Sequence, residues 1–164
     1  MNIFYLSDHP HLCAEFHCDK HISKMIVETA QMLSTAHHEL DGENAILGIY
    51  KSTHKNHPSN VWVRENYGNY MYTWSLLYYL LKEYSKRYGK IHATHRLLDP
   101  LSVRPKNIDG TPVHTEPPQC MPDEYKVEGD SIQAYRNYYL GEKHFAQWKY
   151  TPTPNWWKQK GEVA

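Results

Sequence analysis

The sequence predicts a mainly α protein, a compact single-domain helical bundle with long irregular loops. Three observations lead to this fold class. Apolar residues recur at helical spacing in two long segments, stretches with glycine and proline separate them, and strands do not alternate with helices. The length of 164 residues suits one domain over 1–164, and a content of 40% hydrophobic and 22% charged residues is typical of globular chains.

The first elements are predicted from an apolar start and two helix-initiation signals. Residues 3–6 are expected to form a short strand or an extended segment packed on the core. Pro10 suits a first helical turn and predicts a short helix over about 8–17. Asp19 is expected to cap a longer helix that runs to about Leu40. The buried face of that helix is predicted to carry Ile22, Ile26, Thr29, Leu33 and Ala36.

The next helix is predicted to form the centre of the core. Ser59 is expected to cap it, Gly68 to mark a kink within it, and Gly89 to stop it. The core-facing side of this helix is predicted to contain Leu76, Leu77, Leu80, Leu81 and Tyr84.

The last third of the chain is predicted to contain one long loop between two helices. Residues 91–98 are expected to form a short helix that Pro100 ends. The segment 99–129 is rich in proline, glycine and charge, so it is either functional or draped over the surface. Asp130 is expected to cap a final helix over 131–148.

Composition limits the partners and the compartment. Lysine plus arginine equals aspartate plus glutamate at 18 each, so no overall field steers the chain toward nucleic acid, although a local basic face would suffice for DNA. Three cysteines without a paired zinc motif predict free thiols in a reducing cytoplasm. No apolar run reaches membrane-spanning length, so no membrane partner is expected. The composition leaves the oligomeric state open.

One face of the helix that starts near Asp19 carries chemically active side chains. The residues at helical spacing on this face are His17, His21, Lys24, Glu28, Gln31 and Thr35. The face is either an ordinary solvated surface or the wall of an active site, because an imidazole, an amine and a carboxylate together suit acid–base chemistry. The predicted catalytic residues are Asp19, His21, Lys24 and Glu28.

Two further readings concern metal and nucleic acid. His17 and His21 stand four residues apart, a spacing that fits two ligands of one metal, but the glutamate of an HExxH motif is missing. Basic residues gather near a predicted helix start and in the "MPDEYK" segment, and such residues suit phosphate contacts. The predicted nucleic-acid-binding residues are Lys51, Lys55, His57, Arg64 and Lys126.

Two resemblances follow from quoted motifs. The chain resembles a group of small tailed-phage proteins that share "CDKHxxKMxxExxQMLSTAH", "HKNHP", "WxRE", "EYxxRYGKxH" and "MPDEYK", a group without an established activity. More distantly, "HLCAEF", the "NHP" loop and the tail with lysine and tryptophan are similar to the phage pyrimidine-dimer DNA glycosylases. That similarity implies a small all-helical protein that cleaves a glycosidic bond and then the strand through an imine.

The glycosylase resemblance also implies roles for particular residues. The acidic residue of that family corresponds to Asp19 here. The family's nucleophile is the amine of a threonine exposed by removal of Met1, whereas Asn2 keeps Met1 in place. Lys24 is therefore the candidate replacement amine, since a partly buried lysine can form an imine.

The sequence is consistent with three functions, and a phage-encoded protein would carry out any of them in the host cytoplasm. The favoured one is a DNA glycosylase or abasic-site lyase of phage type, which needs no cofactor. The second is a metal-dependent hydrolase or nuclease that uses a cluster of histidine, aspartate and glutamate with a divalent ion. The third is a non-enzymatic phage accessory protein that binds a host factor.

Overall fold

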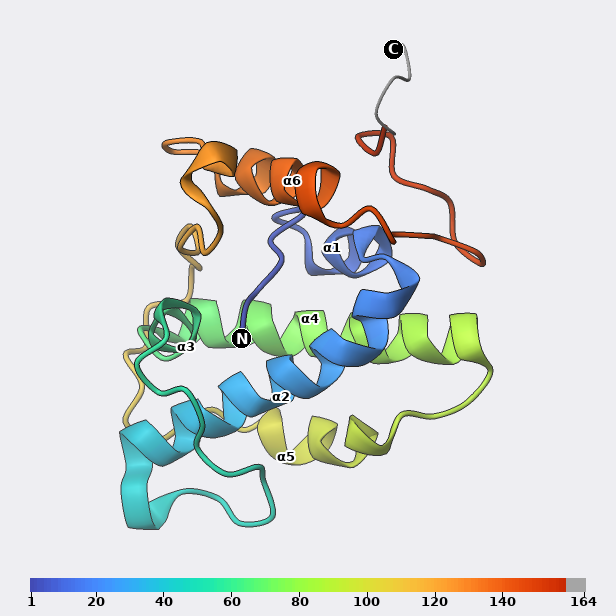
Figure 1. Ribbon diagram of the computed structural model, residues 1–164. Helices are drawn as coiled ribbons and strands as arrows, with labels where there is room; N and C mark the ends of the chain where they lie inside the picture. Colours follow the sequence, from blue (N-terminus) through green and yellow to red (C-terminus); the bar gives the residue numbers. More distant parts are fainter. Residues whose placement is uncertain (159–164) are drawn as a thin grey trace.

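Helices α2 (Asp19–Asp41) and α4 (Tyr67–Tyr88) cross at the centre of the molecule in this computed structural model, which describes residues 1–158 (Figure 1). The other helices are α1 (Pro10–Phe16), α3 (Pro58–Val63), α5 (Leu98–Leu101) and α6 (Ser131–Glu142). Short 3-10 turns occur at Gly42–Asn44, Ala93–Leu97 and Asp123–Tyr125, and no strand forms within residues 1–158. The predicted mainly α bundle with long irregular loops is confirmed. None of the helices in this part of the chain is long and apolar enough to cross a membrane.

The apolar stripe of α2 is buried as the sequence predicts. Ile22, Ile26, Leu33 and Ala36 have no exposed surface, and Thr29 is 1% exposed. Burial of an isoleucine or leucine side chain contributes about 1.5–3 kcal/mol, so this face accounts for the packing of α2 against the core. The helix begins one residue earlier than predicted: Cys18 is the N-cap, and Asp19 is the first helical residue. The Asp19 carboxylate is therefore free to bond elsewhere.

Helix α4 supplies the other half of the central core. Its predicted apolar residues are all buried, and they are Leu76, Leu77, Leu80, Leu81 and Tyr84. Gly89 ends the helix with a φ of 68°, a left-handed conformation that glycine adopts without strain, and its N–H donates to the carbonyl of Ser85.

The segment 57–69 forms two helices where the sequence predicts one kinked helix. α3 ends at Val63, and Asn66 starts α4 as an N-cap whose side chain accepts the N–H of Asn69. His57, and not Ser59, is the N-cap of α3, since its ring nitrogen accepts the N–H of Ser59. The prediction missed this because a histidine ring is an uncommon cap.

Gly68 lies within the first turn of α4 and marks no kink. The backbone of Val113 and His114 passes so close to its Cα that a Cβ atom would overlap with it. This glycine is therefore needed for the close approach of the long loop and not for helix bending.

The boundaries in the last third differ from the predictions at two places. Pro100 lies inside α5 and does not end the preceding helix, because a proline in the first turn lacks only an N–H that would have no partner there. Asp130 does cap α6 through its side chain, as predicted, but α6 ends at Glu142 and not near residue 148.

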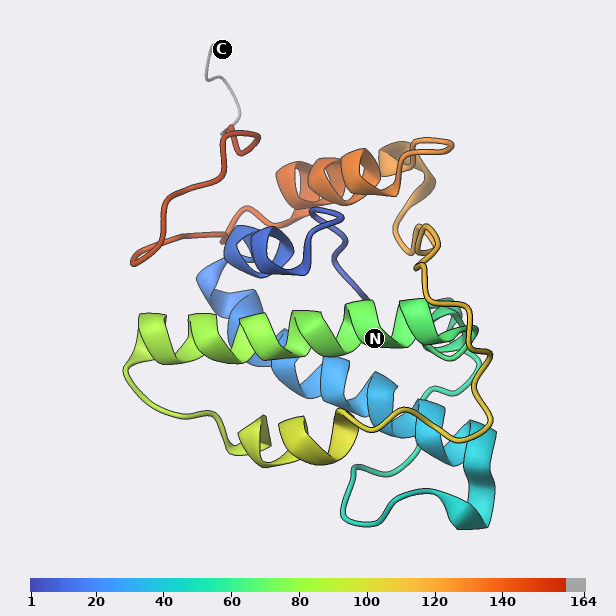
Figure 2. The ribbon, with the colours of Figure 1, turned by 180° about the vertical axis from the view of Figure 1, so that it is seen from behind.

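Residues 143–158 form an irregular tail that leaves α6, passes α1 and turns back at the same edge of the molecule (Figure 2). The N–H of Lys149 donates to Asp19 Oδ2 over 3.0 Å, and the Trp148 indole donates to the carbonyl of Phe16 over 3.1 Å. The tail therefore covers the junction between α1 and α2. The last six residues of the predicted tail, 159–164, lie outside the described part of the chain.

The N-terminal residues 3–6 are extended and form no strand. Of the two predicted alternatives, a short strand or an extended segment packed on the core, the second is found. All four side chains are at most 5% exposed. Phe4 contacts the rings of Tyr135, Tyr138 and Tyr139 from α6, so this segment lies between α6 and the central helices.

Candidate functional site

The predicted active face of α2 divides into three different environments along the helix. His21 is 3% exposed, and His17, just before the helix, has no exposed surface. The side chain of Lys24 is 65% exposed, and that of Glu28 is 14% exposed. The histidines are buried, Lys24 is exposed, and Glu28 is mostly buried beside a charged partner. The face is therefore neither fully solvated nor one continuous site.

The two histidines contact different partners in the core. Nδ1 of His17 donates to the carbonyl of Cys13 over 2.6 Å, while Nδ1 of His21 lies 2.7 Å from the Tyr139 hydroxyl. Burial lowers the pKa of His17 to about 4 and that of His21 to about 3, so both rings are neutral at neutral pH. They serve as polar members of the core.

No metal-ligand cluster accompanies these histidines. Among residues 1–158, no three histidine, cysteine, aspartate or glutamate side chains are grouped closely enough to hold a metal ion. The weak metal candidates His17 and His21 thus have no third ligand within the described chain.

The buried histidines predict a loss of stability in acid. Their folded-state pKa values lie below the ordinary 6.5, so the unfolded chain binds these protons first, and stability falls as pH drops from 6.5 toward 4. Each histidine should remove about 3 kcal/mol from the free energy of unfolding between these pH values. Urea unfolding of wild type and His21→Gln across pH 7 to 4 measures this, and the variant should show a shallower pH dependence. An unchanged slope in the variant, equal to that of the exposed control His144→Gln, would contradict it.

Glu28 forms an ion pair with the start of the chain. The Met1 α-ammonium lies 3.0 Å from Glu28 Oε1, and Lys24 Nζ lies 4.0 Å from Glu28 Oε2. Oε2 is buried and accepts no hydrogen bond from any described residue. A buried carboxylate oxygen without a donor costs free energy, so its retention next to an amine marks this place as a functional candidate.

The long loop and α6 hold the chain start in place. The Asn2 side-chain amide donates to the carbonyl of Cys120 over 2.9 Å, and its oxygen accepts from the Tyr135 hydroxyl over 2.9 Å. Residues 3–6 anchor the following segment in the core. The amine is thereby fixed beside Glu28.

His57, the N-cap of α3, lies within electrostatic range of this group. Its Nδ1 accepts the N–H of Ser59, so the neutral ring carries its proton on Nε2. Burial lowers its pKa, the positive charges of Met1 and His54 lower it further, and Glu28 opposes the shift. Met1, Lys24, Glu28 and His57 are called the amine–carboxylate site below.

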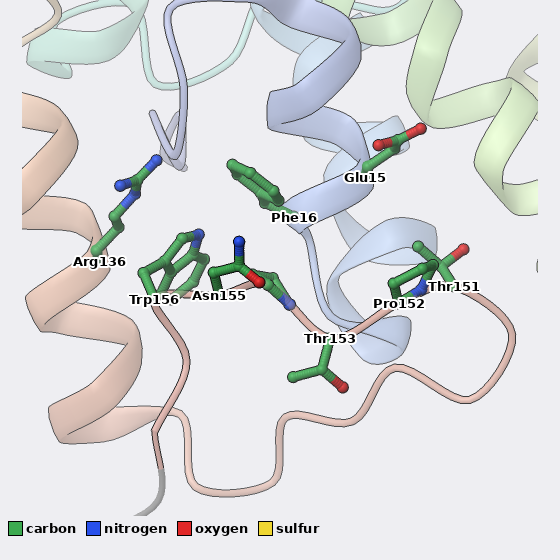
Figure 3. A pocket seen from close by; sticks show the side chains of 9 residues that line it. Glu15, Phe16, Arg136, Thr151, Pro152, Thr153, Asn155 and Trp156 are labelled. Atoms are coloured by element: carbon green, nitrogen blue, oxygen red, sulfur yellow. The ribbon is translucent and has the colours of Figure 1, made fainter. Parts of the chain in front are cut away.

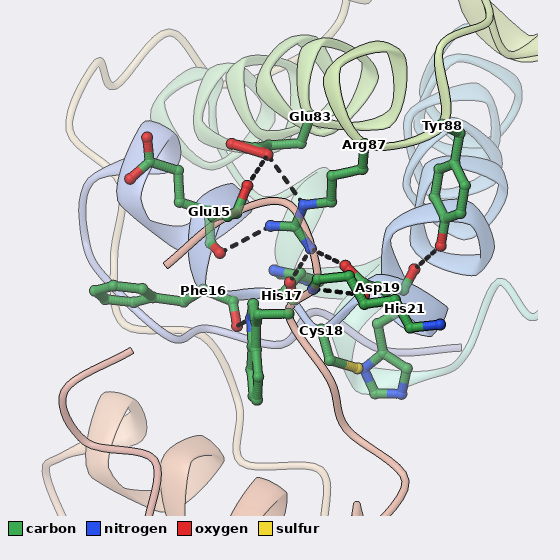
Figure 4. A network of polar contacts seen from close by, with 12 residues as sticks. Glu15, Phe16, His17, Cys18, Asp19, His21, Glu83, Arg87 and Tyr88 are labelled. Carbon is green, nitrogen blue, oxygen red and sulfur yellow. Dashed lines mark hydrogen bonds and ion pairs between the residues drawn. The ribbon is translucent and has the colours of Figure 1, made fainter. Parts of the chain in front are cut away.

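Asp19 belongs to a separate network around Arg87, whose side chain is completely buried (Figure 4). Arg87 donates to Asp19 Oδ1 over 3.2 Å and to Glu83 Oε2 over 3.1 Å. It also donates to the carbonyls of Glu15 and His17. Asp19 lies about 13 Å along α2 from Glu28 and on the opposite side of the helix, so it does not join the amine–carboxylate site.

The predicted nucleic-acid-binding residues are only partly brought together. His57 joins the amine–carboxylate site, while Arg64 donates to the carbonyl of Lys55 over 2.8 Å. Lys55 also lies 3.9 Å from Glu39, and Lys51 is exposed. Lys126 pairs with Asp123 over 2.8 Å in the long loop.

A pocket of about 560 Å³ opens between the end of α1 and the tail (Figure 3). Phe16, Arg136 and Trp156 form one side of it, and the Arg136 guanidinium lies 5.6 Å from the centre of each of the two rings. The Trp156 indole nitrogen is buried and has no hydrogen-bond partner among residues 1–158. No member of the amine–carboxylate site lines this pocket.

The α-amine of Met1 is not among the site residues that the sequence predicts. The sequence favours the side chain of Lys24 as the amine, because Asn2 retains Met1. A backbone amine has no residue letter, and only its contact with Glu28 identifies it. The glycosylase resemblance, in which an N-terminal amine reacts, was the one signal that pointed to it.

Comparisons with known proteins do not assign this arrangement. No family model matches the chain, and neither a curated protein nor a solved structure matches it. The resemblance to phage proteins and to the glycosylases therefore stays a prediction.

Proposed function

We propose that this protein is a DNA glycosylase or abasic-site lyase that works through an imine on the α-amine of Met1. The observation that carries the proposal is the 3.0 Å contact between this amine and Glu28 Oε1. An amine beside a carboxylate provides the nucleophile and the proton carrier that imine chemistry on a sugar requires. The similarity of "HLCAEF" to the phage glycosylases supports DNA as the substrate.

In the proposed lyase reaction, Glu28 accepts a proton from the Met1 ammonium, and the amine attacks C1′ of a ring-opened abasic sugar. A C–N bond forms, and the carbonyl oxygen leaves as water with the two protons of the amine. The proton held by Glu28 then returns to nitrogen and gives the protonated imine. Loss of a C2′ proton from the protonated imine sends its electron pair toward C3′, and the C3′–O bond to the phosphate breaks. Water then hydrolyses the imine and restores the amine.

The same amine suits the glycosylase step. Its attack at C1′ of a damaged nucleotide breaks the bond between C1′ and the base, and the base leaves with the bonding electron pair and a proton from the attacking nitrogen. The bond between C1′ and O4′ then breaks, O4′ takes the proton held by Glu28, and the opened sugar is left as the protonated imine. The enzyme has to turn the nucleotide out of the duplex to reach this carbon. His57 carries its proton on Nε2 and can donate a hydrogen bond to the sugar, whereas Glu28, once it has given up its proton, is the candidate acceptor of the C2′ proton in the later step.

Lys24 takes a different role in this proposal from the one the sequence suggests. Its side chain is 65% exposed and lies 4.0 Å from Glu28 Oε2. An exposed ammonium beside the reacting groups suits a contact with a DNA phosphate. The more enclosed α-amine is the better candidate nucleophile.

Borohydride trapping on duplex DNA with one abasic site tests the proposal. Borohydride reduces an imine to a stable covalent adduct, and peptide mass spectrometry then locates the modified residue. We expect an adduct on the Met1 peptide and none on the peptide that contains Lys24, with trapping retained in Lys24→Ala. The intact mass of the purified protein checks that the Met1 amine is free.

Each alternative result of the trapping experiment has a definite meaning. An adduct on Lys24 would overturn the assignment of the α-amine. A folded protein with a free Met1 amine and no adduct would overturn the imine mechanism and favour a non-enzymatic accessory role. Acetylation of the α-amine should abolish trapping, and unchanged trapping after acetylation would also contradict the proposal.

A further inference from the structure

A second hollow lies where the start of α2, the end of α4 and the tail meet. Its volume is about 640 Å³, and neither Met1 nor Glu28 lines it. Its walls carry the rings of Tyr88, Phe145 and Tyr150, with Lys20 and Lys149 among them. We call it the aromatic–basic cleft.

The aromatic side chains of this cleft are unusually exposed. Tyr88 is 41% exposed, Phe145 is 44% exposed and Tyr150 is 65% exposed. Within residues 1–158, no other phenylalanine, tyrosine or tryptophan side chain is exposed. The chain buries its other aromatic rings at least partly, so the concentration of these three in one hollow calls for a partner that covers them.

The charge of the cleft is positive. Lys20 and Lys149 are exposed, and Lys20 Nζ lies 4.6 Å above the centre of the Phe145 ring. The carboxylate of Asp19, which also lines the cleft, is paired with the buried Arg87 guanidinium, as Figure 4 shows. The distance between Asp19 Oδ1 and Arg87 Nη1 is 3.2 Å. Two lysines are therefore left to meet a negatively charged ligand.

The cleft is held in shape before any ligand arrives. The Tyr88 hydroxyl donates to the carbonyl of Asp19 over 2.7 Å. The N–H of Asp19 donates to the carbonyl of Gln147, and the N–H of Lys149 donates to Asp19 Oδ2. Because these bonds fix α4 and the tail on α2, little conformational entropy is lost when a ligand binds.

We propose that the aromatic–basic cleft binds single-stranded DNA. Exposed rings stack on unpaired bases of any sequence, and lysines beside them contact the phosphates, which is how single strands are bound without sequence readout. Bases inside a duplex are already stacked on each other and do not reach such rings. The choice of DNA rests on the proposed function, whereas the rings and charges are independent of it.

The position of the cleft suits an enzyme that opens a duplex. Lys20, Lys24 and Glu28 follow one another at four-residue intervals along α2, so Lys20 at the cleft edge lies about 12 Å along the helix axis from Glu28. Strand leaving the reaction site can therefore reach the cleft along an exposed lysine, with its bases unstacked.

Fluorescence anisotropy with a labelled twelve-residue oligothymidine tests the cleft. We expect Phe145→Ala and Tyr150→Ala each to weaken binding about tenfold, as for loss of one stacked base. Lys149→Gln should lower the slope of log affinity against log salt by about 0.7, as for loss of one phosphate contact on a single strand. Tyr78→Ala is the matched control, because Tyr78 on α4 forms the same kind of lysine–ring pair outside the cleft. In that pair, Lys82 Nζ lies 5.0 Å above the centre of the Tyr78 ring. The affinity of Tyr78→Ala should equal that of wild type.

The outcomes separate the cleft from the proposed function. No binding by wild type, equal losses in Tyr78→Ala, or tighter binding of duplex DNA or oligouridine would overturn the cleft proposal. If wild type binds oligothymidine through the cleft but gives no borohydride adduct, the proposed enzymatic function is wrong and the cleft proposal stands. If borohydride trapping occurs but Phe145→Ala and Tyr150→Ala bind oligothymidine normally, the cleft proposal is wrong and the proposed function stands.

Discussion

Arg87→Met is expected to lower the free energy of unfolding by about 3–5 kcal/mol, because it leaves two carboxylates without their buried cation. Asp19 and Glu83 both pair with Arg87, whose side chain has no exposed surface. The variant also loses the bonds to the carbonyls of Glu15 and His17, which join α4 to the junction of α1 and α2. Urea unfolding monitored by circular dichroism measures the change.

The Arg87 prediction has a matched control and a coupling test. Arg96 donates to the carbonyl of Gly48 over 3.3 Å at an exposed position, so Arg96→Met should change stability by less than about 0.5 kcal/mol. The double variant Glu83→Gln with Arg87→Met should lose less than the sum of the single changes, since it removes one of the unpaired charges. Arg87→Met within 1 kcal/mol of wild type would show that the network contributes little.

Glu28→Gln is expected to slow imine trapping on abasic-site DNA at least about a hundredfold, with the fold retained. Glutamine has nearly the same shape and still accepts a hydrogen bond from the Met1 amine, but it does not take up the proton that imine formation releases. The rate of adduct formation under single-turnover conditions measures the effect.

A glutamate elsewhere on α2 provides the control for Glu28. Glu39 lies 3.9 Å from Lys55 in an exposed ion pair, and Glu39→Gln should trap at the wild-type rate. Glu28→Asp keeps the carboxylate at a greater distance from the amine and should retain part of the rate. A Glu28→Gln rate within threefold of wild type, with unchanged unfolding, would remove Glu28 from the chemistry.

The core was predictable because it depends on local patterns. The spacing of Ile22, Ile26 and Leu33 indicates a buried face, and burial confirms it. The predicted cap at Asp130 and the stop at Gly89 are also local features, and both are found. The predictions that were wrong concern helix ends, such as Ser59 and Pro100, where a neighbouring residue or a turn position decides the outcome.

The candidate site was predictable only as a set of residue types. The sequence singled out Lys24 and Glu28, and the structure places Glu28 against the Met1 amine and Lys24 beside the other oxygen of Glu28. It also singled out Asp19 and His21, and these take structural roles beside Arg87 and Tyr139. Periodicity places a charged residue on a helix face but does not say which distant group it meets.

Residue spacing is enough to predict a mainly α bundle and the buried faces of α2 and α4, because hydrophobic burial follows helical spacing. The partners of the charged groups depend instead on how distant segments of the chain pack together. Asp19 meets Arg87 from 68 residues away, and Glu28 meets a backbone amine that has no side chain to recognise. Charges act through space, so their pairing depends on how the helices and the tail pack, and this packing determines where the proposed chemistry takes place.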